Sequence, residues 1–424
     1  MDQQADIGRL GLGIRPQILP LRRQSELITE MVRGRLDTIL PDAMADAGID
    51  AWLVLCQEDN PDPIFLTMIP FDNWHPILSC LLFVRDGTTI RRYNLSGVDT
   101  KDLYERPYAG QLEEKQWPLL IDLLTQHDPQ TIGINIGTIA WSAGGLTQFL
   151  YTQLQKFLPA TYRDRLVSAE KAAVRWASTM TDAEAIHFRR VTELGQYMIG
   201  ECFSARTITP GVTTIDDLVW HYWQHTFDIG LDVAFRPYFR IHRDARETRY
   251  PDNVVAPGDV VHCDVGIKYM RFNSDHQHLA YVPRLGETGP SAGLRARLAY
   301  NNRLQDIYMA GFKHGLSGNE MLRAMLERAR AEGIPDPKIY SHNLGLFLHQ
   351  PGPLIGLPWD QDARLPRGDV RLNYNSAFVM ELSTNGPVPE WDGQLLRLGT
   401  EEPVIFTKDG CRTLCGRQTE YHVI

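Results

Sequence analysis

The 424-residue sequence has few cysteines and no long apolar run. Six cysteines in a chain of this length do not predict a disulfide scaffold. Cys411 and Cys415 are close in sequence, but no second pair accompanies them, so no zinc-binding motif is predicted. Because no apolar run approaches the roughly 20 residues of a membrane-spanning helix, we expect no membrane segment.

Basic residues are not in excess either, since the formal net charge is −9. That balance argues against nucleic-acid binding, which usually needs a basic face. The start of the chain, MDQQAD, lacks the basic and then apolar layout of a secretion signal. The apolar fraction of 43% and the charged fraction of 22% are ordinary for a globular protein. We therefore expect a cytoplasmic protein.

A chain of 424 residues is long for one hydrophobic core, so we expect two domains. The first, over residues 1–175, has alternating helix and strand signals and is predicted to be a small α/β domain. Its predicted elements are a helix over 25–49 and strands over 51–56, 77–84 and 132–136.

The second domain is expected over residues 176–424. Capping-box patterns, Thr181 with Glu184 and Ser317 with Glu320, predict the starts of two long helices. Strand-like runs lie between and after them. We predict an α+β fold here, an antiparallel sheet with helices packed outside it, and find no internal repeat.

Two aspartates mark a predicted hairpin. Asp264 ends the apolar run 260–264, and Asp275 follows 11 positions later. A turn near Tyr269-Met270 would place the two Asp opposite each other, with Cβ atoms about 5 Å apart. Two carboxylates that close raise each other's proton affinity. A cation between them would remove this conflict.

Further ligand-type residues follow. Glu381 closes the buried strand-like run 377–381, where a carboxylate is disfavoured unless it is paired or binds metal. Glu401 and Glu402 are adjacent in a strand, so only one of them can face the same site. His342 opens a segment that contains Gly345. Because glycine interrupts regular secondary structure, this segment is predicted to be bent.

In this order and spacing these residues resemble the pita-bread metallopeptidase family, which includes aminopeptidase P, prolidase, methionine aminopeptidase and creatinase. The resemblance rests on Asp264-x-Gly266, Ser274-Asp275, His342-x-x-Gly345-x-x-x-His349, Glu381, and a late Glu before Gly410. It covers about residues 175–424, and the preceding part resembles the amino-terminal domain of aminopeptidase P, prolidase and creatinase.

The resemblance implies a pita-bread fold and two divalent metal ions, with Mn most expected and Zn, Co or Fe as alternatives. Asp264 would bind one ion, His342 and Glu381 the other, and Asp275 and Glu401 would bridge them. The spacing to Gly410 selects Glu401 over Glu402. A hydroxide shared by the ions would attack the amide.

Glu381 is then the expected general base, and His349 is expected to contact substrate or the developing oxyanion. His278 and Arg249 are further candidates for substrate binding, although histidines close to a metal site are more often only packed. An arginine-rich stretch over residues 236–249 is predicted to form a solvated loop whose charges pair with one another. The sharper alternative is that one of these arginines binds a substrate carboxylate.

The surroundings depart from the family pattern. Gln350 replaces the usual Glu, Leu382 the usual Pro, and Gly399 the usual Arg; the Asp-Ile-Thr-Arg-Thr motif becomes Asp-His-Gln-His-Leu over 275–279. A substrate-site histidine expected upstream of Gly258 has no match, with Glu247 or Arg249 nearest. Substrate identity is thus less constrained than metal binding.

Three functions remain open. The first is hydrolysis at the amino end of a peptide by an Xaa-Pro aminopeptidase-like or dipeptidase-like enzyme. The second is C–N hydrolysis of a small metabolite, as in creatinase or ectoine hydrolase. The third is a non-catalytic, peptidase-like binding protein. The resemblance also implies a homodimer.

Overall fold

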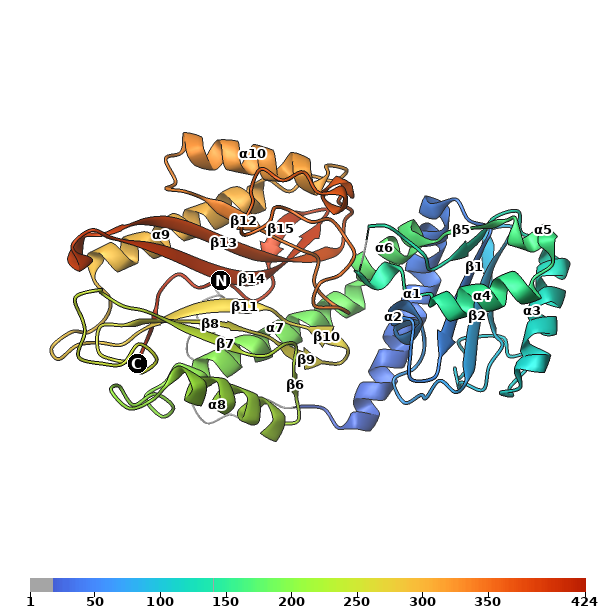
Figure 1. The fold of residues 1–424 in the computed structure, drawn as a ribbon, viewed down its shortest axis with the longest axis horizontal. Helices are drawn as coiled ribbons and strands as arrows, with labels where there is room; N and C mark the ends of the chain where they lie inside the picture. Colours follow the sequence, from blue (N-terminus) through green and yellow to red (C-terminus); the bar gives the residue numbers. More distant parts are fainter. Residues whose placement is uncertain (1–17, 140) are drawn as a thin grey trace. The chain divides into compact units, whose positions relative to one another are not determined.

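The computed structural model describes residues 18–139 and 141–424 (Figure 1). The expectation that the chain starts without a secretion signal concerns residues 1–17, which lie outside the described residues. The chain forms two compact units. One contains Leu19–Glu184 and His349–Gly352, and the other contains Ala185–Leu348 and Pro353–Ile424. The division thus falls inside helix α7 (Asp182–Cys202), nine residues beyond the expected junction at 175–176.

The first unit contains a five-stranded sheet in the order β3-β2-β1-β4-β5. Its central strand β1 is almost wholly apolar and buried, as expected for a strand covered on both faces. The predicted helix and three predicted strands correspond to α1, β1, β2 and β4. The elements of this unit are α1 (Leu21–Ala47), β1 (Ala51–Gln57), α2 (Pro63–Met68), β2 (Leu78–Asp86), β3 (Thr89–Asn94), α3 (Glu113–His127), β4 (Ile132–Ile134), α4 (Gln148–Phe157), α5 (Ala160–Arg163), β5 (Leu166–Ser168) and α6 (Glu170–Ser178).

A buried ion pair lies within this unit. The side chains of Arg35 on α1 and Glu184 are 2% and 1% exposed, and their charged groups are 2.9 Å apart. Arg35 also donates to the carbonyl oxygens of Thr179 and Trp176, and its guanidinium lies over the Trp176 ring. Glu184 in turn accepts from the Thr181 backbone N–H and hydroxyl, which confirms the predicted capping box.

We predict that Arg35→Met lowers the free energy of unfolding of this unit by about 3–5 kcal/mol, because Glu184 would stay buried without its partner. The matched control is Arg91→Met, since Arg91 pairs with Glu105 and lies over Tyr93 but is exposed. That change should cost about 1 kcal/mol or less. Urea unfolding followed by tryptophan fluorescence would measure both. Equal losses for the two variants would contradict the prediction.

The second unit is built on a sheet with the strand order β12-β13-β14-β11-β8-β7. Strands β15 and β16 pair with β14 and β11, and a smaller sheet has the order β10-β9-β6. Its strands are β6 (Asp232–Val233), β7 (Tyr238–His242), β8 (Val260–Val265), β9 (Ile267–Tyr269), β10 (Phe272–Asn273), β11 (His276–Tyr281), β12 (Lys338–Tyr340), β13 (Ser376–Val388), β14 (Gln394–Thr407), β15 (Gly410–Thr413) and β16 (His422–Val423).

Helices cover the outer face of this sheet. In Figure 1, α9 (Ala292–Ala310) and α10 (Gly318–Ala331) lie beside β13 and β14, and α8 (Ile215–Asp228) lies beside β7. Apolar side chains of α9 and α10 pack on Phe378, Met380 and Leu382 of β13. Ser317 and Glu320 form the predicted capping box at the start of α10. The face of the sheet that carries Glu381 and Glu401 is therefore the inner one.

The hairpin register differs from the prediction. Tyr269 pairs with Phe272, so the two-residue turn consists of Met270 and Arg271, both with positive φ. A turn centred one position later than expected shifts every pairing by two residues. Asp264 therefore faces Gln277 and not Asp275. Because side chains alternate along a strand, Asp275 still lies on the same face as Asp264, diagonally across the pair.

The described helices include none that is long and apolar enough to span a bilayer.

Candidate metal centre

One row of directly paired residues crosses the second unit's sheet. Each member faces the next on the neighbouring strand, so all of them share one face, with adjacent Cβ atoms about 5 Å apart. The row runs Tyr340, Glu381, Glu401, Gln277, Asp264, Tyr238. Strand pairing thus brings together three carboxylates that are separated by up to 137 positions (401 − 264) in the sequence.

Asp275 and His342 complete the cluster. Asp275 lies two positions before Gln277, and His342 lies two positions after Tyr340, on a segment that continues to bond with β13. The His342 Nε2 atom is 3.8 Å from Asp275 Oδ2. Asp275, His342 and Glu401 each offer one ligand atom, and these atoms lie within 4.8 Å of one another.

The His342 ring is held in one tautomer. Its Nδ1 lies 3.1 Å from the carbonyl oxygen of Asn343, which can only accept a hydrogen bond. Nδ1 therefore carries a proton, which leaves Nε2, 3.8 Å from Asp275 Oδ2, as the ring nitrogen available to a metal ion. Metal-binding histidines are commonly oriented in this way by a carbonyl at the other ring nitrogen.

The clustered carboxyl groups have raised pKa values. Burial is the main cause, and it raises the pKa of Asp264 to about 7 and that of Glu381 to about 8. Burial also raises the pKa of Asp275 and of Glu401 well above the usual range, and repulsion from the neighbouring carboxylates adds to it. Four such groups cannot all carry charge at neutral pH without a counter-ion.

Gln277 lies between two of the acids. Its Nε2 donates to Glu401 Oε2 at 2.8 Å and approaches Asp264 Oδ2 at 3.4 Å. Its Oε1 lies 3.0 Å from His262 Nε2, which must therefore be the donor. The chain His262–Gln277–Glu401 orients a carboxylate from behind, as outer hydrogen bonds do for metal ligands.

The donor set fits hard divalent cations. Four carboxylates with one oriented imidazole form an oxygen-rich shell of the kind that binds Mn²⁺ and related ions. The raised pKa values agree with this fit, because a bound cation would favour the ionised carboxylates that burial and mutual repulsion disfavour. All five predicted ligands, Asp264, Asp275, His342, Glu381 and Glu401, thus lie on or beside one row of the inner face.

His278 does not belong to this cluster. Neighbouring residues of a strand point to opposite faces, and Gln277 occupies the inner face. His278 points outward, where its Nε2 is 2.9 Å from Glu402 Oε1. The predicted contact between His278 and substrate is therefore wrong. The sequence alone does not give the strand register, which decides the face that His278 occupies.

His349 belongs to the first unit, together with residues up to Gly352. Its ring packs edge-on against Trp141, with centroids 5.1 Å apart. The role of His349 at the substrate stays a prediction.

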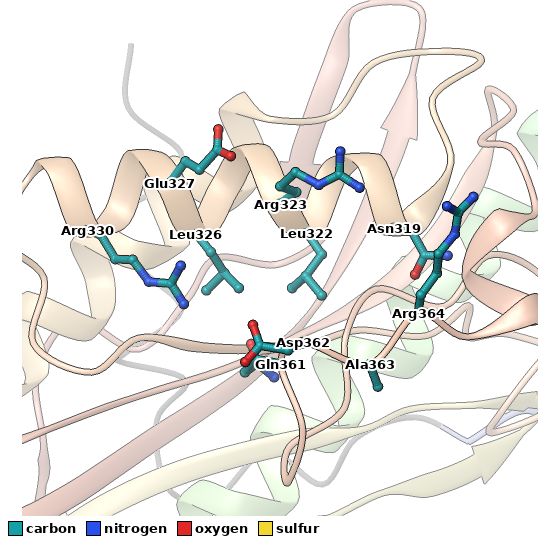
Figure 2. A pocket seen from close by; sticks show the side chains of 10 residues that line it. All are labelled: Asn319, Leu322, Arg323, Leu326, Glu327, Arg330, Gln361, Asp362, Ala363 and Arg364. Carbon is teal, nitrogen blue, oxygen red and sulfur yellow. The ribbon is translucent and has the colours of Figure 1, made fainter.

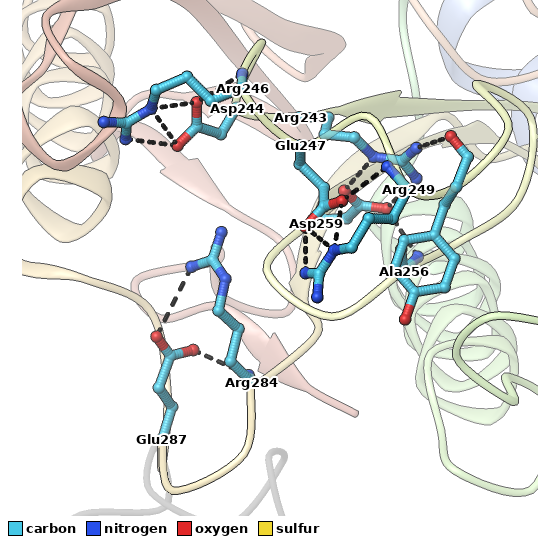
Figure 3. Close-up of polar contacts among 10 residues, drawn as sticks. Arg243, Asp244, Arg246, Glu247, Arg249, Ala256, Asp259, Arg284 and Glu287 are labelled. Atoms are coloured by element: carbon cyan, nitrogen blue, oxygen red, sulfur yellow. Dashed lines mark hydrogen bonds and ion pairs between the residues drawn. The ribbon is translucent and has the colours of Figure 1, made fainter.

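Two arginines of the stretch, Arg246 and Arg249, pair with acids of the same stretch, whereas Arg243 pairs with the buried Asp259 outside it. The Arg249 side chain is 74% exposed and binds the carboxylate of Glu247, two positions earlier in the chain. Figure 3 shows the ion pairs Arg243–Asp259, Arg246–Asp244 and Arg249–Glu247. These contacts favour a structural role for Arg249 over the predicted contact with substrate.

Two residues near the row escaped the sequence analysis. Tyr340 is the row's end member on β12, and Arg367 is a buried cation whose pKa burial lowers to about 10. The positive charge of Arg367 lowers the pKa of the Tyr340 hydroxyl, but burial has the larger effect and raises it. Tyr340 is next to Glu381 because β12 pairs with β13, and no local sequence pattern predicts this pairing.

A separate small cavity of about 170 Å³ lies between α10 and residues 361–364. Figure 2 shows Arg323, Glu327 and Arg330 of α10 around it, opposite Asp362. None of the five predicted ligands lines it, so this surface cavity is not the metal centre.

Comparisons with known proteins agree with this geometry. Residues 187–393 match the model of Metallopeptidase family M24. The X-Pro aminopeptidase of Thermotoga maritima MSB8 has a similar structure, with a TM-score of 0.65 and 17% identity over 90% of this chain and 100% of that chain. The Xaa-Pro dipeptidase of Bacillus anthracis gives a TM-score of 0.60 and 15% identity over 94% and 100%.

The N-terminal domain of the FACT complex subunit SPT16 from chickpea, Cicer arietinum, also has a similar structure. Its TM-score is 0.58 and its identity is 11%, over 93% of this chain and 99% of that chain. No curated protein sequence matches significantly.

The second unit therefore has the pita-bread fold, an antiparallel sheet with helices on its outer face, and the predicted fold class is confirmed. Residues 187–393 match the model of metallopeptidase family M24, the family that the sequence resemblance predicted for this part of the chain.

We predict that cation binding releases protons in a pH-dependent way. With raised pKa values of about 7 and 8, Asp264 and Glu381 are largely protonated at about pH 6, and a cation must displace those protons. At about pH 9 they are already ionised, so fewer protons should be released. Calorimetry with Mn²⁺ in buffers of different ionisation enthalpy would count them.

The same shifts set the stability of the metal-free protein. A carboxyl group whose pKa is raised by folding stabilises the folded state below its unfolded pKa and loses that contribution as pH rises through its folded pKa. The Tm of the metal-free protein should thus fall between about pH 5 and about pH 8, and Asp264→Asn should reduce the fall. If the number of protons released on Mn²⁺ binding did not change with pH, the assignment of raised pKa values to Asp264 and Glu381 would be contradicted.

Proposed function

We propose that the protein is a metal-dependent hydrolase that cleaves an amide bond at the amino end of a peptide, with Xaa-Pro peptides as the substrate class. The observation that carries the proposal is the inner-face row, in which Glu381, Glu401 and Asp264 meet Asp275 and His342. The similar structures titled X-Pro aminopeptidase and Xaa-Pro dipeptidase support the choice of substrate.

The five ligands would hold two divalent ions. Asp264, Asp275, His342, Glu381 and Glu401 would hold these ions, and the four carboxylates would balance four positive charges. The oxygen-rich shell favours Mn²⁺, with Zn²⁺, Co²⁺ and Fe²⁺ as alternatives. When bound, such ions supply a water of lowered pKa and polarise the amide carbonyl.

The chain's own residues then position and move a proton. Glu381 is only half-buried, so its carboxylate can reach a substrate, and a bound cation would keep it ionised and able to accept a proton. Its Oε atoms would take the proton from the attacking water and return it to the leaving nitrogen. His262 and Gln277 hold the neighbouring Glu401 in place.

His349 would donate a hydrogen bond to the carbonyl oxygen as negative charge develops on it. Association as a homodimer is proposed alongside, and light scattering would measure it.

A binding protein is the second candidate. The structural similarity to a domain of a FACT complex subunit favours it, since that similarity spans 93% of this chain. The departures at Gln350, Leu382 and Gly399 leave room for it as well as for a hydrolase of a small metabolite.

A substrate panel separates these functions. The Mn²⁺-loaded protein should hydrolyse Xaa-Pro peptides, lose activity on chelation and regain it when Mn²⁺ is returned. Tripeptide cleavage alone indicates an aminopeptidase and dipeptide cleavage alone a dipeptidase, with Xaa-Ala peptides as the matched control. Turnover of small cyclic amides alone would favour the metabolite hydrolase. Stoichiometric metal without any turnover would favour the binding protein.

Glu381→Gln tests the general base. We expect kcat to fall by about 100-fold or more, because the amide cannot accept the proton at neutral pH. Metal content must be measured in parallel, since the same side chain is a proposed ligand. Glu327→Gln, on an exposed position of α10, is the control and should leave kcat unchanged. Wild-type kcat in a metal-loaded Glu381→Gln protein would exclude this role.

A further inference from the structure

A second cluster of metal-ligand side chains lies on the outer face of the same strands. We call His276, His278 and Glu402 the outer-face cluster. They are strand neighbours of Asp275, Gln277 and Glu401, but alternation turns them away from the inner face. All three are buried, and one ligand atom from each lies within 4.8 Å of the other two.

Ring nitrogens in this cluster face a carboxylate without directed hydrogen bonds. His278 Nε2 is 2.9 Å from Glu402 Oε1, and His276 Nδ1 is 3.5 Å from Glu402 Oε2. Within residues 18–139 and 141–424, neither atom has a hydrogen-bond partner of acceptable geometry, and nor does His276 Nε2. Leaving a buried polar atom unsatisfied costs about 1–3 kcal/mol, so this arrangement requires an explanation.

A metal ion would provide that explanation. Ligand atoms about 2.0–2.1 Å from a tetrahedral Zn²⁺ lie about 3.3 Å from one another. The two ring nitrogens lie 2.9 and 3.5 Å from the two oxygens of Glu402, on either side of this value. An ion also bonds along the lone pair of a ring nitrogen, a direction in which Glu402 offers no hydrogen bond.

The surroundings orient the ligands. His278 Nδ1 lies 3.2 Å from His422 Nε2, which places an outer partner at the nitrogen opposite the proposed metal-binding atom. Glu402 Oε1 accepts from the Gln418 backbone N–H at 2.8 Å, and Oε2 accepts from Gln196 Nε2 at 3.1 Å. The carboxylate is therefore held in a single orientation.

Thiols are also available. Cys263 is the direct cross-strand partner of His278, so its Cβ lies about 5 Å from that of His278 on the same outer face. Helix α7 packs closely above, because a Cβ at Gly195 would lie 2.7 Å from His276 Nε2. Zinc binds nitrogen, oxygen and sulfur donors, and a closed site with four protein ligands is typical of structural zinc.

We propose that the outer-face cluster binds one Zn²⁺ ion, with His276, His278 and Glu402 as ligands and Cys263 as the candidate fourth. The ion would join β11 to β14 directly behind the pairing of Gln277 with Glu401. Its role is structural, since it would hold the register that assembles the inner-face row.

The test uses a full-length inner-ligand variant, Asp264→Asn with His342→Ala and Glu381→Gln, which removes ligands of the proposed catalytic ions. After loading with Zn²⁺ and dialysis, we expect about one zinc per chain by plasma mass spectrometry. Adding His278→Phe should remove that zinc. Adding His225→Phe, a half-buried histidine on α8, is the matched control and should retain it.

A folded inner-ligand variant that binds no zinc would overturn the proposal, as would zinc that survives His278→Phe. Circular dichroism checks folding. If the variant does not fold, anomalous scattering at the zinc edge from crystals of the wild-type protein decides the question. A peak between His278 and Glu402 supports the site, and its absence in zinc-loaded crystals refutes it. Neither readout depends on peptide hydrolysis, so the proposed function stands or falls separately.

Discussion

The register between β13, β14, β11 and β8 is the constraint on which the rest of the second unit depends. It aligns Glu381, Glu401, Gln277 and Asp264 in one row, so that acids from distant parts of the chain become neighbours at about 5 Å. A slip of one residue on β14 would turn Glu401 outward and Glu402 inward. The pairing of β13 with β14, which runs from Ser376 to Val388, makes such a slip costly.

This crowding is unfavourable for the metal-free protein. Burial raises the pKa values of Asp264 and Glu381 to about 7 and about 8, and repulsion from Asp264 adds to the effect on Glu381. A fold optimised for stability alone would not place four acids together. The apolar packing of α9 and α10 on β13 and β14 compensates for the strain, and an oxygen-binding cation would relieve it.

Much of this could be predicted from the sequence because some signals are local. The capping boxes at Thr181 and Ser317 are defined by residues three positions apart, and both were found where expected. The ligand identities followed from a family pattern spread over the chain. The hairpin register could not be predicted in this way. The turn at Met270 and Arg271 has two positive φ angles, which neither residue type favours. Gln277 and Tyr340 entered the site only through pairing.

The error over His278 has a physical origin that also explains the outer-face cluster. A strand between two layers presents successive residues to different surroundings, so the motif Asp275-His276-Gln277-His278 serves two sites at once. On the outer face, Glu402 is ionised in spite of its burial, which by itself would raise its pKa. The neighbouring His278 and His276 outweigh that effect and keep the pKa well below the usual range. Acids of the inner face are crowded by acids, whereas the single acid of the outer face is surrounded by imidazoles. The two faces of β11 and β14 therefore differ in charge as sharply as two separate sites, although only one residue separates them along each strand.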